Sequence, residues 1–280
     1  MKKTFLLAVG IAALMASYVF CMDIEGMTPA LEDVKKNVTE TFTSIDKELS
    51  AAAGKLSAVD LKTGKARKIL SGLCKGQDYL IDCAIVDGAG RMIMVEPAEY
   101  SKLEGSDISQ QAHIITLRQS KKPVFSNVFR SVEGVEAIDF EYPIFSDNGK
   151  FIGSVSMLVK QDALFDDIVM PLVEEKAYKI WVMQKDGLII YDPDSAQIGR
   201  NIFSDEFFQP FEGLISFSRT VAKAKSGGGS YDFYSRGLED KKIVKKYAVW
   251  DTVSLYGTEW RIIVMEADKN PGGLKLKSKK

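Results

Sequence analysis

Two kinds of hydrophobic spacing divide the chain. Between residues 38 and 59, apolar residues recur at alternating steps of four and three, which places them on one face of an α-helix. They are Val38, Phe42, Ile45, Leu49, Ala52, Leu56 and Val59. Thr28-Pro29 combines a capping hydroxyl with a proline suited to a first helical turn. We therefore predict a helix from 29 to 60, forming most of a stalk at 28–74.

From residue 78 onward the pattern changes to short β-rich runs separated by turns. The first runs lie at 79–86, 91–95, 135–145 and 151–159. Asp87-Gly88 and Asn148-Gly149 fall between neighbouring runs and are typical of hairpin turns. A short helix is expected at 113–117. Antiparallel strands with helices on one side predict an α+β unit.

The same order of elements occurs a second time. Strands are predicted at 179–184, 188–191 and 231–234, and the glycine run 226–230 is interpreted as a flexible hairpin loop. An acidic residue precedes a proline in both halves, at Glu96-Pro97 and Asp192-Pro193. A repeat of about 95 residues is too long for a solenoid unit. It predicts two lobes, with the boundary near Met170-Pro171-Leu172.

The N-terminus departs from the composition of the rest. Lys2 and Lys3 precede an uncharged apolar stretch at 4–22, the pattern of an export signal. The stretch is also long enough to cross a membrane if it is retained. A cleaved signal peptide, a membrane anchor at 1–22 and lipidation at Cys21 remain alternatives. Each predicts an exported protein, either anchored at the outer face of the cytoplasmic membrane or periplasmic or extracellular.

Charge and motif content narrow the function classes. The 280 residues include 37 basic and 38 acidic ones, a net charge of −1, which argues against nucleic-acid binding. The single histidine and the lack of a Cys-x-x-Cys motif give no support to a zinc site. Without a nucleophile elbow or phosphate loop, we predict no enzyme and no cofactor. The Lys- and Gly-rich segment 268–280 predicts a disordered basic tail.

Cys74 and Cys83 form a pair in the exported portion. An even cysteine count outside the cytosol permits a disulfide between them. Two separate buried thiols are the alternative.

Several fragments, in their order along the chain, resemble double Cache domains, the tandem PAS-like sensor modules found outside bacterial and archaeal membranes. They are Lys122-Pro123-Val124-Phe125-Ser126, Tyr142-Pro143-Ile144-Phe145, Asn148-Gly149-Lys150-Phe151, Asp186-Gly187-Leu188-Ile189-Ile190-Tyr191-Asp192-Pro193, Ile198-Gly199-Arg200-Asn201 and Gly227-Gly228-Gly229-Ser230-Tyr231. The resemblance implies a long N-terminal helix, a membrane-distal lobe at 75–165 and a membrane-proximal lobe at 175–267. It also implies that a small molecule binds the distal lobe, between the sheet and the segment covering it.

Relatives that bind amino acids carry charged and aromatic anchors that this chain lacks, since Gln111, His113 and Ile114 stand at the first cluster and Phe129 and Ser131 at the second. The polar and aromatic residues expected near the pocket are Gln111, His113, Phe125, Phe129, Arg130, Asp139, Glu141 and Tyr142.

Asp139 and Glu141 alternate with apolar residues, so both carboxylates share one face of a strand. Facing inward, they would favour a cationic or hydroxylated ligand; facing outward, they would be solvated. His113 would bond a ligand or be an ordinary satisfied residue, and Arg130 would grip a carboxylate or lie on the surface. Asp192 and Asp194 are predicted to cap turns or helix starts.

We expect an exported sensory module that binds a small solute in its distal lobe. No second apolar segment follows Glu266, so we expect a membrane receptor or transducer to act as its partner. The alternative is a surface interaction protein with a PAS-like fold and no small-molecule pocket.

Overall fold

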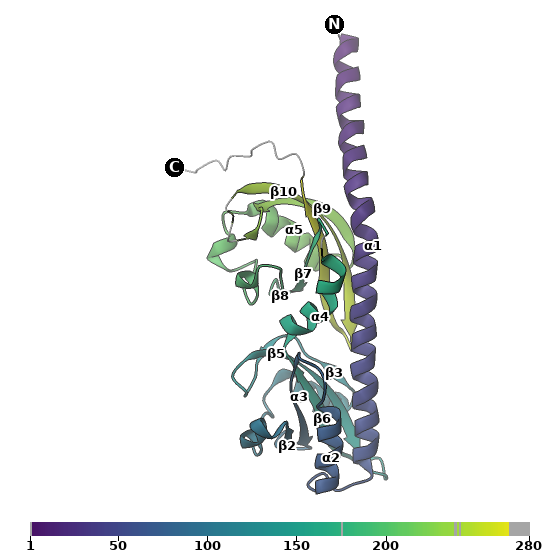
Figure 1. Ribbon diagram of the computed structural model, residues 1–280, viewed down its shortest axis with the longest axis vertical. Helices are drawn as coiled ribbons and strands as arrows, with labels where there is room; N and C mark the ends of the chain where they lie inside the picture. The colour runs from purple at the N-terminus through teal and green to yellow at the C-terminus, as the bar shows by residue number, and fades with distance from the viewer. Residues whose placement is uncertain (1, 175, 238–239, 241, 269–280) are drawn as a thin grey trace. The chain divides into compact units, whose positions relative to one another are not determined.

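The computed structural model describes residues 2–174, 176–237, 240 and 242–268, with side chains from Gly26 onward (Figure 1). The chain divides into two compact units. The first sheet unit comprises residues 37–168 and 254–259. The second sheet unit comprises the described residues of 1–36, 169–253 and 260–280.

Helix α1 runs over Lys2–Ser57, so it does not begin at Thr28-Pro29 as predicted. Pro29 lies inside the helix and removes one N–H donor from it. The buried stripe nevertheless continues on both sides of Pro29, through Met27, Leu31 and Val34. Burying such side chains stabilises by about 1.5–3 kcal/mol each, which offsets the roughly 3 kcal/mol cost of a proline in a helix.

The first sheet unit contains an antiparallel sheet in the order β2-β1-β6-β5-β3, with β4 also paired to β5. Its strands are β1 (Leu80–Asp87), β2 (Met92–Glu96), β3 (Val124–Phe125), β4 (Phe129–Arg130), β5 (Glu136–Phe145) and β6 (Phe151–Val159). One face of this sheet packs against α1. There the ring of Phe42 lies 5.0 Å from that of Phe125 and 5.6 Å from that of Phe140, centroid to centroid.

The helices of the first sheet unit are α2 (Gly64–Leu73), the 3-10 helix η1 (Ala98–Leu103), α3 (Ala112–Ser120) and the first part of α4 (Gln161–Val173). The expected helix at 113–117 is therefore present as α3. Sequence reasoning missed α2 and α4. Pro171, expected at a boundary between lobes, lies inside α4.

The second sheet unit repeats the strand order of the first. Its sheet runs β8-β7-β11-β10-β9, the counterpart of β2-β1-β6-β5-β3. The strands are β7 (Lys179–Gln184), β8 (Ile189–Tyr191), β9 (Gly227–Tyr234), β10 (Ile243–Leu255) and β11 (Thr258–Ala267). Its further helices are η2 (Ser195–Gln197), η3 (Glu206–Phe208) and α5 (Glu212–Lys223). The predicted α+β class, a long N-terminal helix followed by two antiparallel sheets with flanking helices, is confirmed.

The glycine run 226–230 is not the flexible loop expected, because residues 227–230 belong to β9 and pair with β10. Aromatic rings occupy the space that side chains would need. A Cβ on Gly227 would lie 2.5 Å from the Trp250 ring, and one on Gly229 would lie 3.1 Å from the Phe217 ring. The lack of a side chain at Gly227 and Gly229 therefore allows the Trp250 and Phe217 rings to pack directly on the backbone of β9.

The predicted N-terminal signal or anchor and the predicted C-terminal tail lie largely outside the described residues. The side chains of the proposed signal or anchor at 1–22 and the tail beyond Asp268 lie outside the described residues. Among the residues searched, no helix combines the length and apolar character needed to cross a membrane.

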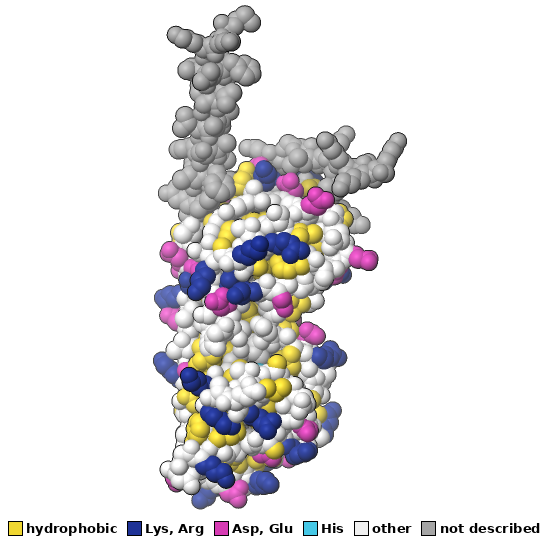
Figure 2. Space-filling model, turned by 180° about the vertical axis from the view of Figure 1, so that it is seen from behind, with side chains coloured by type: hydrophobic (Ala, Val, Ile, Leu, Met, Phe, Trp, Pro, Cys, Tyr) yellow, Lys and Arg dark blue, Asp and Glu magenta, His cyan; other side chains and the backbone are white. Residues whose placement is uncertain are grey.

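The face drawn in Figure 2 carries Lys and Arg side chains interspersed with Asp and Glu. On that face, no concentrated basic surface of the kind that binds nucleic acid is visible.

Candidate functional site

Strand register places three carboxyl side chains on one face of the first sheet. Asp139 of β5 and Asp82 of β1 both stand opposite Leu158 of β6, and Glu141 stands opposite Ser156. Residues directly opposite in a sheet share a face. That face is turned inward, because Asp82 is 1%, Asp139 4% and Glu141 1% exposed. The inward alternative for the two predicted carboxylates is the one observed.

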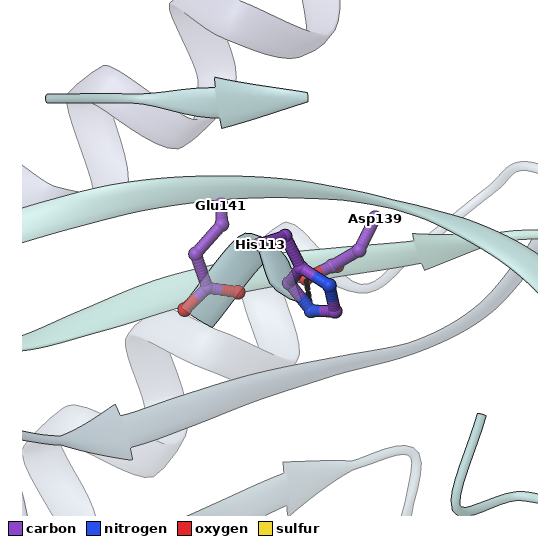
Figure 3. A group of neighbouring side chains, drawn as sticks. All are labelled: His113, Asp139 and Glu141. Carbon is purple, nitrogen blue, oxygen red and sulfur yellow. Dashed lines mark ion pairs between the residues drawn. The ribbon is translucent and has the colours of Figure 1, made fainter. Parts of the chain in front are cut away.

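His113 reaches the same place from α3. Its Nε2 lies 3.3 Å from Oδ2 of Asp139, and its ring packs 4.6 Å from the Phe129 ring, centroid to centroid. Figure 3 shows the three side chains of His113, Asp139 and Glu141 directed toward one another, two from β5 and one from α3. The strand and the helix thus build one buried polar cluster.

Burial moves this cluster toward its neutral forms. It raises the pKa of Asp139 to about 7, that of Asp82 to about 9 and that of Glu141 well above its usual value. Burial also lowers the pKa of His113. The interaction between Asp139 and Glu141 lowers the pKa of the first and raises that of the second, as expected for two carboxyls in one site.

Several oxygens of the cluster have no hydrogen-bond partner among the described residues. They are Oδ2 of Asp82, Oδ1 of Asp139 and both carboxyl oxygens of Glu141. A buried polar atom without a partner costs about 1–3 kcal/mol. Once the carboxyls ionise, their oxygens can only accept hydrogen bonds, so the ionised cluster is short of donors.

A small cavity adjoins the cluster. Its volume is about 20 Å³, which is room for about one water molecule. Its lining includes Asp82, His113, Asp139 and residues 131–133 of the turn between β4 and β5. None of the described lining residues is a lysine or arginine.

The predicted site residues divide between this cavity and other places. Gln111, His113, Phe129 and Asp139 line the cavity, and Glu141 belongs to the adjoining cluster. The other three lie elsewhere. Phe125 stacks on Phe140 on the face of the sheet that packs against α1, and Tyr142 points to that face too. Arg130 of β4 is exposed and stands opposite Glu136 of β5.

Sequence reasoning missed Asp82, Glu133 and Ser156, which also line the cavity, as does Ser131 from the second cluster of the resemblance. Asp82 carried a usable signal, because it is a charged residue inside an otherwise apolar strand. Glu133 and Ser156 carried none, since a glutamate in a turn and a serine in a strand are both common.

The cluster also has the spacing of a metal site. His113, Asp139 and Glu141 each offer a ligand atom, and these atoms lie within 4.8 Å of one another. Imidazole with carboxylates is a ligand set that suits several divalent metals. A count of one histidine gave no indication of this arrangement.

Cys74 and Cys83 are free thiols in this structure. Cys83 is buried and Cys74 half-buried, with the Cys74 thiol donating a hydrogen bond to the carbonyl oxygen of Glu96 at 3.1 Å. A hydrogen bond with Cys83 lowers the pKa of Cys74, so the two thiols are neighbours.

Residues 40–161 match the family model described as HK/GC/chemotaxis protein-like, sensor domain. This is a class of sensor domains rather than of enzymes. No curated protein matches the chain.

Solved structures with the same fold include an extracellular ligand binding receptor from Desulfohalobium retbaense, with a TM-score of 0.72 and 32% identity over 85% of this chain. The chain spans 39% of that receptor's length. The ligand-binding domain of the Campylobacter jejuni chemoreceptor Tlp3, in complex with 4-methylisoleucine, has a TM-score of 0.64 at 12% identity, covering 89% of this chain and 92% of that one. The ligand-binding domain of the Pseudomonas aeruginosa amino acid chemoreceptor PctC, in complex with GABA, has a TM-score of 0.59 at 13% identity. The match covers 86% of this chain and 98% of that one.

Proposed function

We propose that the chain is an extracytoplasmic double Cache sensor module that binds a small solute in its first sheet unit. It acts through a membrane receptor or transducer and is held at the membrane by its N-terminal segment. Three observations support this: the sensor-domain match over residues 40–161, the extracellular receptor domains among its structural neighbours, and the repeated strand order of the two sheets.

The buried carboxyl cluster supports a ligand that carries an amine. An ammonium group offers three donors, and the cluster holds carboxyl oxygens that lack them. No described lysine or arginine lines the cavity to compete for those oxygens. GABA and 4-methylisoleucine, the solutes named with the two chemoreceptor neighbours above, each carry an amino group as well as a carboxylate.

A ligand of this kind has to open the site. About 20 Å³ holds no solute larger than water. The turn at 131–134 forms the outer wall, with Val132 40% exposed. We therefore expect the ligand to displace this turn as its amine enters.

The test is a thermal shift series on the purified chain with three molecules of matched length: putrescine, 1,4-butanediol and succinate. A ligand at a hundredfold excess over its Kd stabilises a protein by about 2.7 kcal/mol. We expect putrescine to raise the melting temperature and succinate to have no effect. Asp139→Asn and Glu141→Gln should each abolish the shift, while Asp147→Asn, in the exposed turn after β5, should keep it.

A metal ion is the second candidate, favoured by the close spacing of ligand atoms from His113, Asp139 and Glu141. Added Zn²⁺ or Mn²⁺ would then stabilise the chain, EDTA would reverse the effect, and His113→Gln would remove it. Stabilisation by metal but by no amine would select this candidate over the amine.

The surface interaction alternative predicts a different result. A folded sample that is stabilised by no amine, diol, carboxylate or metal would contradict solute binding in the first sheet unit and favour that alternative.

A further inference from the structure

A cavity much larger than the one beside the acidic cluster lies in the second sheet unit. Its volume is about 400 Å³, within the range of small-molecule pockets. Aromatic side chains from two strands, Trp181 of β7 and Tyr231 and Phe233 of β9, form one wall, and Phe208 of η3 adds another ring. Such a wall suits the hydrophobic body of an organic ligand.

Lys246 of β10 supplies a charge to this pocket. It stands opposite Tyr231 in the sheet and is 3% exposed. Its ammonium lies 5.4 Å from the centre of the Phe233 ring, and among the described residues it has no hydrogen bond or ion pair. Buried lysines are normally paired. The charges of Asp192 and Asp194 attract the Lys246 ammonium, while its N–H donors remain available to a ligand.

Trp181 adds a second donor. Its indole N–H is buried beside the Tyr231 hydroxyl, and no described atom accepts a well-formed hydrogen bond from it. Indole N–H groups normally find an acceptor when buried. An acceptor from a ligand would satisfy both Trp181 and Lys246.

The acidic groups of the pocket are already engaged. Oδ1 of Asp192 accepts from the backbone N–H of Asp194 at 2.8 Å and from the side-chain amide of Gln197 at 3.3 Å. Asp194 accepts from the N–H of Ala196 at 3.2 Å. Both therefore serve as turn caps, as predicted. Lys179 and Arg236 also line the pocket, so basic residues outnumber acidic ones there.

We propose that this pocket is a second ligand site, which takes a small organic carboxylate with a hydrophobic body. The ligand carboxylate accepts hydrogen bonds from the Lys246 ammonium and the Trp181 indole N–H. Its hydrophobic part packs on the rings of Phe208, Tyr231 and Phe233. The site is independent of the acidic cluster in the first sheet unit and prefers ligands of the opposite charge.

The test uses three ligands that share a phenyl ring and a two-carbon chain: phenylacetate, phenylacetamide and phenethylamine. Binding to the purified full chain is measured by isothermal titration calorimetry. We expect phenylacetate to bind at least about tenfold more tightly than phenylacetamide, because a hydrogen bond between charged groups contributes about this much to affinity. Phenethylamine should not bind through this pocket.

Two variants test the assigned donors. Lys246→Met keeps the length of the side chain and should weaken phenylacetate binding about tenfold or more, with little effect on phenylacetamide. Trp181→Phe keeps a ring, removes the N–H and should weaken phenylacetate binding severalfold. Lys245→Met is the matched control, because Lys245 points to the opposite face of β10; it should bind phenylacetate as the unmodified chain does.

The melting temperature of each variant establishes that it is folded. The proposal is overturned by any of three results: no phenylacetate binding to the unmodified chain, tighter binding of phenethylamine than of phenylacetate by the Asp139→Asn chain, whose amine site in the acidic cluster is impaired, or unchanged phenylacetate binding by a folded Lys246→Met chain.

Discussion

The Nε2 atom of His113 lies 3.3 Å from Oδ2 of Asp139, and each side chain is only 5% exposed. The histidine comes from α3 and the aspartate from β5, so this contact joins the helix to the sheet it covers. Burial favours the neutral form of both groups. A cationic ligand would therefore enter a cluster whose carboxyls still hold protons near neutral pH.

Amine binding should strengthen as the pH rises. Asp139, with a pKa of about 7, and Asp82, with a pKa of about 9, must release protons to pair with a cation. The charge of Glu133 contributes to raising the pKa of Asp82. Glu141 also keeps its proton, because burial raises its pKa, and His113 is neutral, because burial lowers its pKa. We expect the putrescine affinity to rise up to about tenfold per pH unit for each proton released.

Calorimetry in two buffers with different ionisation enthalpies measures this proton release. An affinity that stays constant between about pH 5.5 and about pH 8 would show that the carboxyls are already ionised before the ligand arrives.

The stability of the ligand-free protein should fall as the pH rises. The folded state keeps a proton on Asp82 up to about pH 9, whereas the unfolded chain releases it near 3.8. Between these values the folded state binds more protons, so raising the pH favours unfolding by up to about 1.4 kcal/mol per unit. Asp82→Asn should reduce the change of the free energy of unfolding with pH, as measured by urea unfolding at several pH values. Asp147→Asn, at an exposed position, should leave this pH dependence unchanged. Equal pH dependences for Asp82→Asn and the unmodified chain would contradict the raised pKa of Asp82.

Gly227→Ala should destabilise the second sheet unit. Its Cβ would lie 2.5 Å from the Trp250 ring, and such overpacking costs about 1–3 kcal/mol. Gly213 in α5 has nothing within 4 Å of its Cβ position, so Gly213→Ala should be neutral or gain up to about 1 kcal/mol from helix propensity. Urea unfolding of the two variants measures the difference, and similar stabilities would refute the role of Gly227.

Arg261 should be essential to the end of α5. It is 1% exposed, and its Nε donates to the carbonyls of Val221 at 3.0 Å and Ala224 at 3.1 Å. Arg261→Met removes the guanidinium donor from both carbonyls, although that of Ala224 still accepts from the Trp250 indole N–H at 3.2 Å. We expect a cost of about 1–3 kcal/mol. Lys223→Met, at an exposed position of the same helix, should change the free energy of unfolding by less than about 0.5 kcal/mol. A loss no greater than that of the control would exclude a capping role for Arg261.

Cys74 and Cys83 should form a disulfide on mild oxidation, since their thiols are neighbours. Intact-mass measurement with and without reductant would detect the loss of two hydrogens. Cys74→Ser should prevent it; a chain that keeps both thiols under oxidising conditions would settle the question in favour of free cysteines.

Much of the fold could be predicted from local patterns. Alternating residues and turn sequences located the strands at 79–86, 151–159 and 179–184 within one or two residues of β1, β6 and β7. The repeat of the acidic-Pro pair anticipated two similar sheets. The start of α1 could not be predicted in this way, because the burial that carries the helix through Pro29 depends on what packs against it.

The sequence alone determined the period of each segment, and with it the α+β class and the shared face of Asp139 and Glu141. Only the tertiary structure decided that this face is buried, that His113 and Asp82 join it, and that the Lys246 ammonium lies in a pocket with no hydrogen bond to any described residue. The reason is physical: side-chain direction follows from local backbone geometry, whereas burial and hydrogen-bond satisfaction depend on which distant segments come together.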